Sequence, residues 1–284
     1  MAGSEDAARL APTVIGVPPR TGALRRRFQS AAPPIVAFAV LVGAWQLAVT
    51  ISGVPVYLLP PPSAVFAAAF LRWADLWSAI STTFLAALVG LSISIFVGVT
   101  SALVMSQSKV LERSFYPYAV ILQTIPIVAI APLVVIWLGA GTPAVITISF
   151  LISLFPMISN TTAGLNSTDH NLMNMFELYN ANWWQRILKL KLPFALPYIM
   201  TGLRISSGLS IIGAIVGEFV GGIGGQRGGL GYVLTAAAIR LDMPYLFAAA
   251  FASAMLGIGI FIVVSFVQNL TLRHWHESAV TREA

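Results

Sequence analysis

The sequence predicts an all-α membrane protein with about six transmembrane helices. Of its 284 residues, 57% are hydrophobic and only 9% are charged, whereas soluble domains carry about 25% charged residues. Most of the chain therefore cannot face water. A membrane-spanning helix needs about 20 mostly apolar residues. Six segments meet this requirement: residues 35–52, 80–105, 116–138, 143–163, 195–220 and 245–270.

The third predicted span contains two prolines, Pro126 and Pro132, that we expect to bend it. Proline removes a backbone donor and clashes with the preceding turn of a helix, so the helix kinks or breaks there. Pro126 therefore has an expected structural role, and neighbouring helices would satisfy the freed carbonyl groups. The connection to the fourth span, residues 139–142, is short.

The basic residues predict that both ends of the chain lie in the cytoplasm. Lys and Arg gather on the cytoplasmic side of a membrane. With the N-terminus inside, three basic residues fall outside: Arg72, Arg227 and Arg240. Arg204 lies within a span, and the other basic residues fall inside. Those inside are Arg9, Arg20, Arg25, Arg26, Arg27, Lys109, Arg113, Arg186, Lys189, Lys191, Arg273 and Arg282.

The composition also predicts domain boundaries. We expect a disordered cytoplasmic tail without a cleavable signal over residues 1–30, a transmembrane domain over residues 31–275, and a cytoplasmic tail over residues 276–284. The absence of cysteine excludes disulfides and thiol chemistry. No catalytic triad or metal-ligand spacing falls within a span, because the histidines all lie in predicted cytoplasmic segments: His170, His274 and His276.

Two segments predicted to lie outside the membrane have unusual compositions. Residues 54–65 contain three consecutive prolines, which argue against a helix there. Residues 221–231 contain seven glycines, which disfavour a stable helix. The glycine segment is either a flexible loop or a close-packed external gate, and the sequence leaves both possibilities open.

The longest predicted cytoplasmic connection, residues 164–194, shows the pattern of two short helices. Four apolar residues share one face of the first helix: Leu172, Met175, Phe176 and Tyr179. Candidate caps precede it: Ser167, Thr168 and Asp169. Asn180 then interrupts the helix, because asparagine tolerates left-handed dihedrals. Asn182 and Gln185 have the spacing of a capping box that begins the second helix.

The second helix has its own apolar face, formed by Trp184, Ile187 and Leu188. Its basic residues, Arg186, Lys189 and Lys191, can reach water, and Pro193 and Pro197 are expected to stop or bend it before the fifth span. Two interpretations remain open. Either the pair lies at the membrane interface with Trp183 and Trp184 among the headgroups, or it docks a cytoplasmic partner with Phe176 and Tyr179 as anchors.

Ionisable and polar residues within the spans are candidates for function. Arg204 and Glu218 lie fourteen positions apart in the fifth span, about 21 Å along a helix, so they cannot pair within it. We expect Arg204 to have a structural role, its side chain extending to the cytoplasmic interface. Glu218 would line the external gate, tie down the glycine segment, or cap loop amides. Gln123 and Thr124, beside Pro126, are candidates for lining a pathway.

The connection before the fifth span resembles the cytoplasmic signature of permease subunits in bacterial ABC importers that depend on a substrate-binding protein. That signature reads Glu-Ala-Ala, three residues, Gly, nine residues, an aliphatic residue, one residue, Leu-Pro. It falls on Asn174, Met175, Phe176, Asn180, Leu190, Leu192 and Pro193. The spacing and Leu-Pro match. Asn174 stands where the family has Glu, Asn180 stands where it has Gly, and Glu177 is a possible substitute for the missing carboxylate.

Other stretches are similar to the nitrate, sulfonate and taurine branch of this family, which includes permeases for bicarbonate, pyrimidine precursors and riboflavin. They are residues 57–65, 122–141, 196–219 and 243–251. The resemblance extends over residues 35–275. It implies a type I ABC importer fold, a bacterial cell-membrane location, and a cargo that is a small polar or anionic solute or a vitamin-like heterocycle.

The resemblance also implies partners: a second permease copy, two cytoplasmic ATPases and an extracytoplasmic binding protein. Residues 168–192 would be the coupling helices, seated in a groove of the ATPase. The expected coupling residues are Asn174, Phe176, Glu177, Tyr179, Asn180, Trp183, Leu192 and Pro193. No G-x-x-x-x-G-K-[ST] motif occurs in the chain. The chain is therefore expected to hold no cofactor, with ATP and Mg²⁺ bound by the partner ATPase.

An ion-coupled secondary transporter is the alternative function. Such transporters commonly show inverted repeats with paired broken helices. No such repeat is obvious here, and Glu218 is the one carboxylate within the predicted spans. The importer permease is therefore the favoured prediction.

Overall fold

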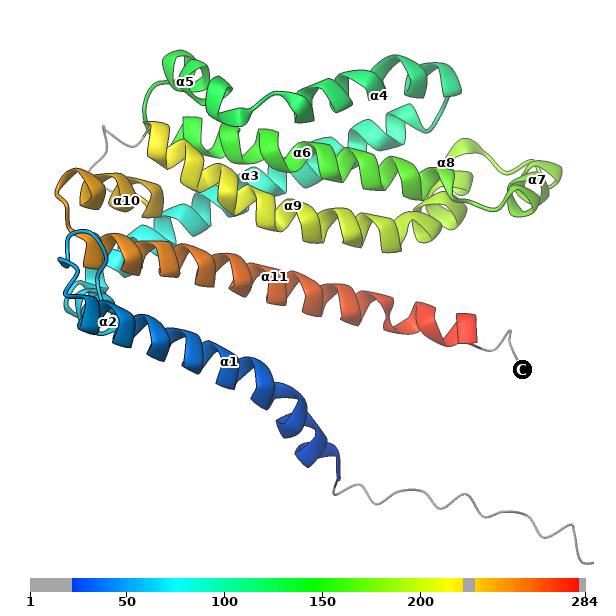
Figure 1. Cartoon of the computed structure of the whole chain (residues 1–284). Helices are drawn as coiled ribbons and strands as arrows, with labels where there is room; N and C mark the ends of the chain where they lie inside the picture. The colour runs from blue at the N-terminus through cyan, green and yellow to red at the C-terminus, as the bar shows by residue number, and fades with distance from the viewer. Residues whose placement is uncertain (1–21, 222–227, 281–284) are drawn as a thin grey trace, which may run out of the picture. The chain divides into compact units, whose positions relative to one another are not determined.

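The computed structural model describes residues 22–221 and 228–280, and every regular element within them is helical (Figure 1). Two compact units are present, Met1–Gly53 and Val54–Ala284. The first contains α1 (Gly22–Ser52). The second contains α2 (Pro62–Leu71), α3 (Trp73–Met105), α4 (Lys109–Thr124), α5 (Ile127–Leu138), α6 (Thr142–Asn166), α7 (His170–Leu178), α8 (Trp183–Arg186), the π-helix η1 (Ile187–Lys191), α9 (Leu192–Gly221), α10 (Leu230–Ile239) and α11 (Met243–Val280).

The structure contains the predicted spans. Five helices in the described residues are long and apolar enough to cross a membrane, and the bent pair α4–α5 makes six. This pair bends by 97°. The kink predicted near Pro126 is confirmed: Ile125, at the junction, takes the extended backbone (φ −75°, ψ 123°) that a following proline favours. Pro132 lies within α5 without breaking it.

In the N-terminal unit, α1 starts earlier than the sequence suggests. It begins at Gly22, so residues 22–30, expected to be disordered, are helical. Only 6% of its apolar window Ile35–Ser52 is buried. Side chains such as Ile51, which is 77% exposed, suit contact with lipid.

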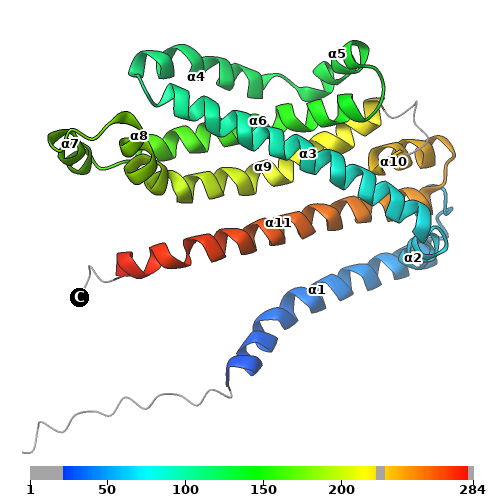
Figure 2. The same ribbon diagram turned by 180° about the vertical axis from the view of Figure 1, so that it is seen from behind.

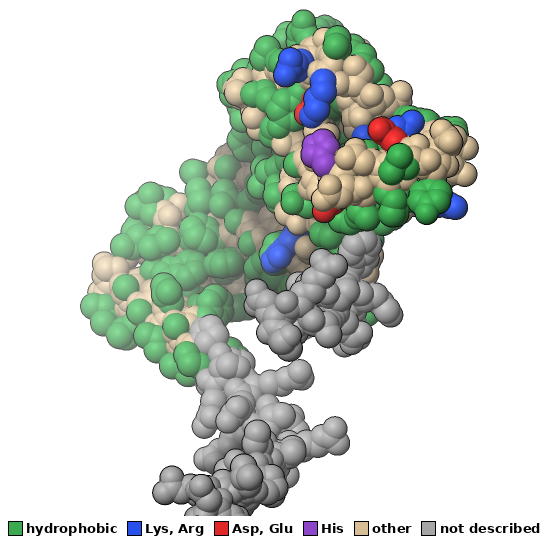
Figure 3. Space-filling model, turned by 90° about the vertical axis from the view of Figure 1, so that its right-hand side faces the viewer, with side chains coloured by type: hydrophobic (Ala, Val, Ile, Leu, Met, Phe, Trp, Pro, Cys, Tyr) green, Lys and Arg blue, Asp and Glu red, His purple; other side chains and the backbone are tan. Residues whose placement is uncertain are grey.

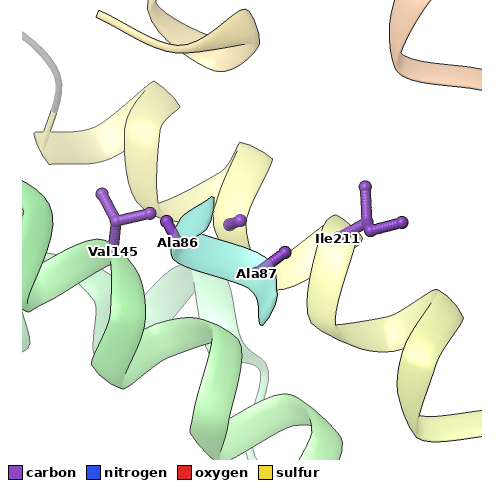
Figure 4. Close-up of a cluster of buried hydrophobic side chains, with 5 residues drawn as sticks. Ala86, Ala87, Val145 and Ile211 are labelled. Atoms are coloured by element: carbon purple, nitrogen blue, oxygen red, sulfur yellow. The ribbon is translucent and has the colours of Figure 1, made fainter. Parts of the chain in front are cut away.

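The core of the second unit is the packing of α3, α6 and α9, and Figure 2 shows α3 crossing the other two helices. Small side chains let the backbones approach closely, as in many membrane helix pairs. A Cβ at Gly213 of α9 would lie 2.7 Å from the Cα of Ser149 in α6. One apolar cluster at this contact contains Ala86, Ala87, Val145, Ile211 and Ala214 (Figure 4).

Buried serines join α6 to α9 by hydrogen bonds. Ser149 Oγ donates to the carbonyl oxygen of Ser210 at 2.8 Å, and Ser206 Oγ donates to that of Ser153 at 2.7 Å. Ser153 also donates to a carbonyl of its own preceding turn. These hydroxyl groups thus stabilise the contact between two spans, because lipid offers no hydrogen-bond partner.

Two short helices, α2 and α10, begin within the two segments that the sequence predicts to be non-helical. The helix α2 begins at Pro62 because proline is well tolerated at the first helical position, where its missing N–H would have no partner. The last of the three prolines is therefore the first residue of a helix. The helix α10 begins at Leu230, within the predicted glycine segment. Residues 222–227 of that segment lie outside the described residues.

Candidate functional site

The connection between α6 and α9 folds into a helical hairpin made of α7, α8 and η1, called the α7–α8 hairpin below. Asp169 caps α7, its Oδ1 accepting from the N–H of Asn171 at 2.7 Å. At the end of α7, Asn180 has a φ of +50°. The Asn180 N–H donates to Glu177 O, and the Ala181 N–H donates to Phe176 O, both at 2.9 Å. This is a Schellman motif, so the left-handed turn predicted at Asn180 is confirmed.

The capping box predicted for the second helix is also confirmed. Gln185 N–H donates to Asn182 Oδ1, and Asn182 N–H donates to Gln185 Oε1, both at 2.8 Å. An ion pair of 3.2 Å between Glu177 and Arg186 joins the two halves. Glu177, the possible substitute for the missing family carboxylate, therefore has a partner within the hairpin.

The buried face of the second helix differs from the prediction. Ile187 and Leu190 are buried, whereas Trp184 and Leu188 are exposed. Ile187, Leu188 and Leu190 lie in the π-helical turn η1, whose spacing differs from the 3.6-residue period of the predicted α-helix. Pro193 then falls in the first turn of α9 without ending the helix.

Lys191, expected to reach water, instead joins the hairpin to α3. Its Nζ donates to the carbonyl oxygen of Ser106, the residue that caps the C-terminus of α3, at 3.1 Å. A lysine there complements the negative end of the helix dipole. The base of the hairpin is thereby attached to the helical core.

The tip of the hairpin exposes apolar side chains. Leu178 and Tyr179 are 82% and 81% exposed. The rings of Trp183 and Trp184 meet edge to face with centroids 4.5 Å apart, and Phe176 is only partly buried. Leu178 was not singled out from the sequence, because it lies off the predicted apolar face. We call Leu178, Tyr179, Trp183 and Trp184 the hairpin tip.

Charged side chains gather at the end of the molecule that carries the hairpin, as Figure 3 shows. Lys109 and Glu112 of α4 form an ion pair there at 3.6 Å. Asn166 at the end of α6 donates to Glu112 at 2.8 Å. With the orientation predicted from the basic residues, this end would lie in the cytoplasm.

The junction of α4 and α5 forms one wall of a cavity of about 400 Å³, called the break cavity below. Gln123 and Thr124, the pathway candidates, line it beside Pro126. Its other walls come from α6 and α9, including Phe155 and Ile212. The structure therefore brings Gln123 and Thr124 to one cavity, and it does not bring Glu218 there.

Glu218 instead lies at the other end of α9, in a buried hydrogen-bonded group called the α10 cap below. Glu218 is 4% exposed, and its carboxylate accepts from the Thr83 hydroxyl at 2.8 and 2.9 Å. It also accepts from the Gly231 N–H at 2.9 Å, while Thr83 Oγ1 accepts from the Leu230 N–H at 2.8 Å. Two side chains thus satisfy the first amides of α10, which a helix leaves without internal partners.

The glycines of the α10 cap allow this close approach. A Cβ at Gly229 would overlap the Glu218 carboxylate, and one at Gly231 would lie 2.8 Å from Glu218 Cβ. These glycines therefore serve close packing. Of the uses considered for Glu218, two match this geometry: the capping of amides and, through Gly231, the holding of the glycine segment.

Arg204 lies on the other half of α9, where its Cζ is 4.3 Å from the centre of the Phe261 ring of α11. This is a cation–π contact between two predicted spans. Among the described residues, no group of three or more His, Asp or Glu side chains is arranged to hold a metal ion.

Residues 90–275 match the family model of the binding-protein-dependent transport system inner membrane component. The chain belongs to this family. The permease is 34% identical over 254 residues to the formylaminopyrimidine transport permease protein of Halalkalibacterium halodurans, covering 88% of this chain and 98% of that one. It is 31% identical over 267 residues to the riboflavin transport system permease protein of Chloroflexus aurantiacus, covering 93% and 98%.

A solved structure of the methionine ABC transporter MetNI in an inward-facing conformation resembles the permease with a TM-score of 0.54. The identity is 19%, and the match covers 72% of this chain and 96% of that chain. This likeness confirms the predicted type I importer fold. The permease is thus a multi-pass inner-membrane subunit of an ABC importer, and ATP hydrolysis belongs to a separate ATPase chain. The importer prediction is confirmed over the ion-coupled alternative.

Proposed function

We propose that the permease forms a homodimer around one pathway and transmits ATPase closure to its spans through the α7–α8 hairpin, residues 168–192. The exposed apolar hairpin tip carries this proposal. Large side chains such as Tyr179, 81% exposed at the end of a capped helix, are the kind that fill pockets on a partner. Asp169, Asn180 and the capping box define the helix ends on either side of the tip, and Lys191 joins the base of the hairpin to α3.

The coupling residues divide into two groups by position. Phe176, Tyr179 and Trp183 would contact the ATPase together with Leu178, and Asn174 and Glu177 would form the polar edge of that contact. Asn180, Leu192 and Pro193 would keep the hairpin in place by their backbone positions. The pairing of Glu177 with Arg186 supports a shared role for these two side chains at the ATPase surface.

The cargo proposed for the permease is a small polar or anionic solute or a vitamin-like heterocycle, delivered by an extracytoplasmic binding protein. The relatives named for formylaminopyrimidine and riboflavin transport support the heterocycle class. Gln123 and Thr124 would line its pathway at the break cavity. Glu218 would hold α10 at the external side, so that α10 forms part of a gate.

The coupling role can be tested by Tyr179→Ala in the full transporter. We expect the ATPase to bind at least about 10-fold more weakly, since truncated anchor residues typically cost about 2 kcal/mol or more. Binding would be measured by titrating purified ATPase onto the permease in nanodiscs. Tyr57→Ala is the control, because Tyr57 is 55% exposed in the segment predicted to lie outside. Unchanged ATPase affinity in Tyr179→Ala would remove this anchor from the proposal.

A further inference from the structure

We infer that the break cavity passes an uncharged solute that carries carbonyl or amide groups, and that it disfavours inorganic and sulfonate anions. This inference rests on the proposed pathway through the break cavity.

The size and walls of the cavity suit a small apolar body. Its volume of about 400 Å³ lies within the range of roughly 300–1,000 Å³ typical of ligand pockets. Most of the lining is aliphatic or proline, with the Phe155 ring as its one aromatic group among the described residues. Such walls favour a ring-sized solute through apolar contact.

The polar groups of the lining are neutral. Gln123 carries a carboxamide that both donates and accepts, and its side chain makes no hydrogen bond to another described residue. The Thr124 hydroxyl donates to Ile121 O at 2.7 Å, so its oxygen remains available as an acceptor. The helix α5 begins at this point, and the first N–H groups of a helix lack internal partners. Together these groups complement an amide or a ring carbonyl.

No charged side chain from the described residues lines the cavity. Within the predicted spans the charged residues are Arg204 and Glu218. Arg204 lies over the Phe261 ring, and Glu218 is bound to Thr83 and Gly231. An anion in the cavity would therefore exchange part of its water shell for apolar walls without meeting a full counter-charge. The start of α5 supplies only about half an elementary charge.

The lack of cysteine in the chain permits a direct test with one introduced thiol. Thr124→Cys would be placed in the transporter assembled with its ATPase and reconstituted in nanodiscs. Three methanethiosulfonate reagents would be compared, one neutral, one with a sulfonate and one with a trimethylammonium group. Tyr57→Cys, at an exposed position, provides the reference rate for each reagent.

After division by the reference rates, we expect the neutral reagent to modify Thr124→Cys at least tenfold faster than the sulfonate reagent. Adding Gln123→Lys should raise the sulfonate rate about tenfold, whereas Gln123→Ala should not. Equal rates for the neutral and sulfonate reagents would overturn the inference. If no reagent reacts with or without ATP, the cavity is not on the pathway and the inference also fails. ATPase activity of the same complex, measured in parallel, shows separately whether the importer function still stands.

Discussion

The α10 cap allows a quantitative prediction for Thr83→Val. Valine keeps the shape of threonine but removes the hydroxyl that donates to Glu218 and accepts from Leu230 N–H at 2.8 Å. Thr83 is fully buried, so water cannot replace these bonds. Leaving a buried group unsatisfied costs about 1–3 kcal/mol. A loss of about 1–3 kcal/mol would favour local opening of the α10 start roughly 5- to 150-fold.

Hydrogen–deuterium exchange of the peptide covering the start of α10 measures this opening. In Thr83→Val the amides of Leu230 and Gly231 should exchange faster by that factor. Thr82→Val is the matched control, because the Thr82 hydroxyl donates within its own helix to Ser78 O at 2.9 Å and should leave α10 unchanged. Equal exchange of the α10 start in wild type and Thr83→Val would refute the reasoning.

Two further substitutions test the packing and the hairpin. Gly213→Ala should lower the thermal unfolding midpoint in detergent, because its Cβ would lie 2.7 Å from the Ser149 backbone and overpacking costs about 1–3 kcal/mol. Gly208→Ala is the control and should leave the midpoint unchanged, because nothing lies within 4 Å of the new Cβ. Equal midpoints for the two variants would contradict the packing account. Asn180→Val should speed proteolysis of the α7–α8 hairpin, because a β-branched residue at φ +50° is strained by about 1–3 kcal/mol, whereas Asn180→Gly should leave the rate unchanged. Equal proteolysis of both variants would show that the left-handed turn does not stabilise the hairpin.

The features predicted from the sequence are those with local causes. Apolar runs of sufficient length identify the spans, and Pro126 marks the break in the third one. Asn180 and the Asn182–Gln185 box were predictable because helix ends depend on side chains within a few residues. The break cavity is harder to predict from the sequence, since its walls come from three separate spans.

The features missed depend on distant partners. Thr83 and Glu218 are 135 positions apart, so no local pattern pairs them. The glycines at the start of α10 suggest a loop. In the structure, Gly229 and Gly231 instead leave the space that the Glu218 side chain needs. The helices α2 and α10 are too short to span a membrane. The prolines and glycines beside them indicate non-helical segments, so the sequence did not predict either helix. The second hairpin helix continues through the π-helical turn η1 into α9, which the apolar spacing does not reveal.

The central claim is that this chain is the permease of an ATP-driven importer. The most direct test is uptake by proteoliposomes containing the permease and its ATPase, with the binding protein outside and radiolabelled riboflavin or formylaminopyrimidine as probe. The account predicts uptake that requires ATP and the binding protein, together with ATPase activity stimulated by that protein. Uptake that continues without ATP and stops when an ionophore removes the ion gradient would contradict it.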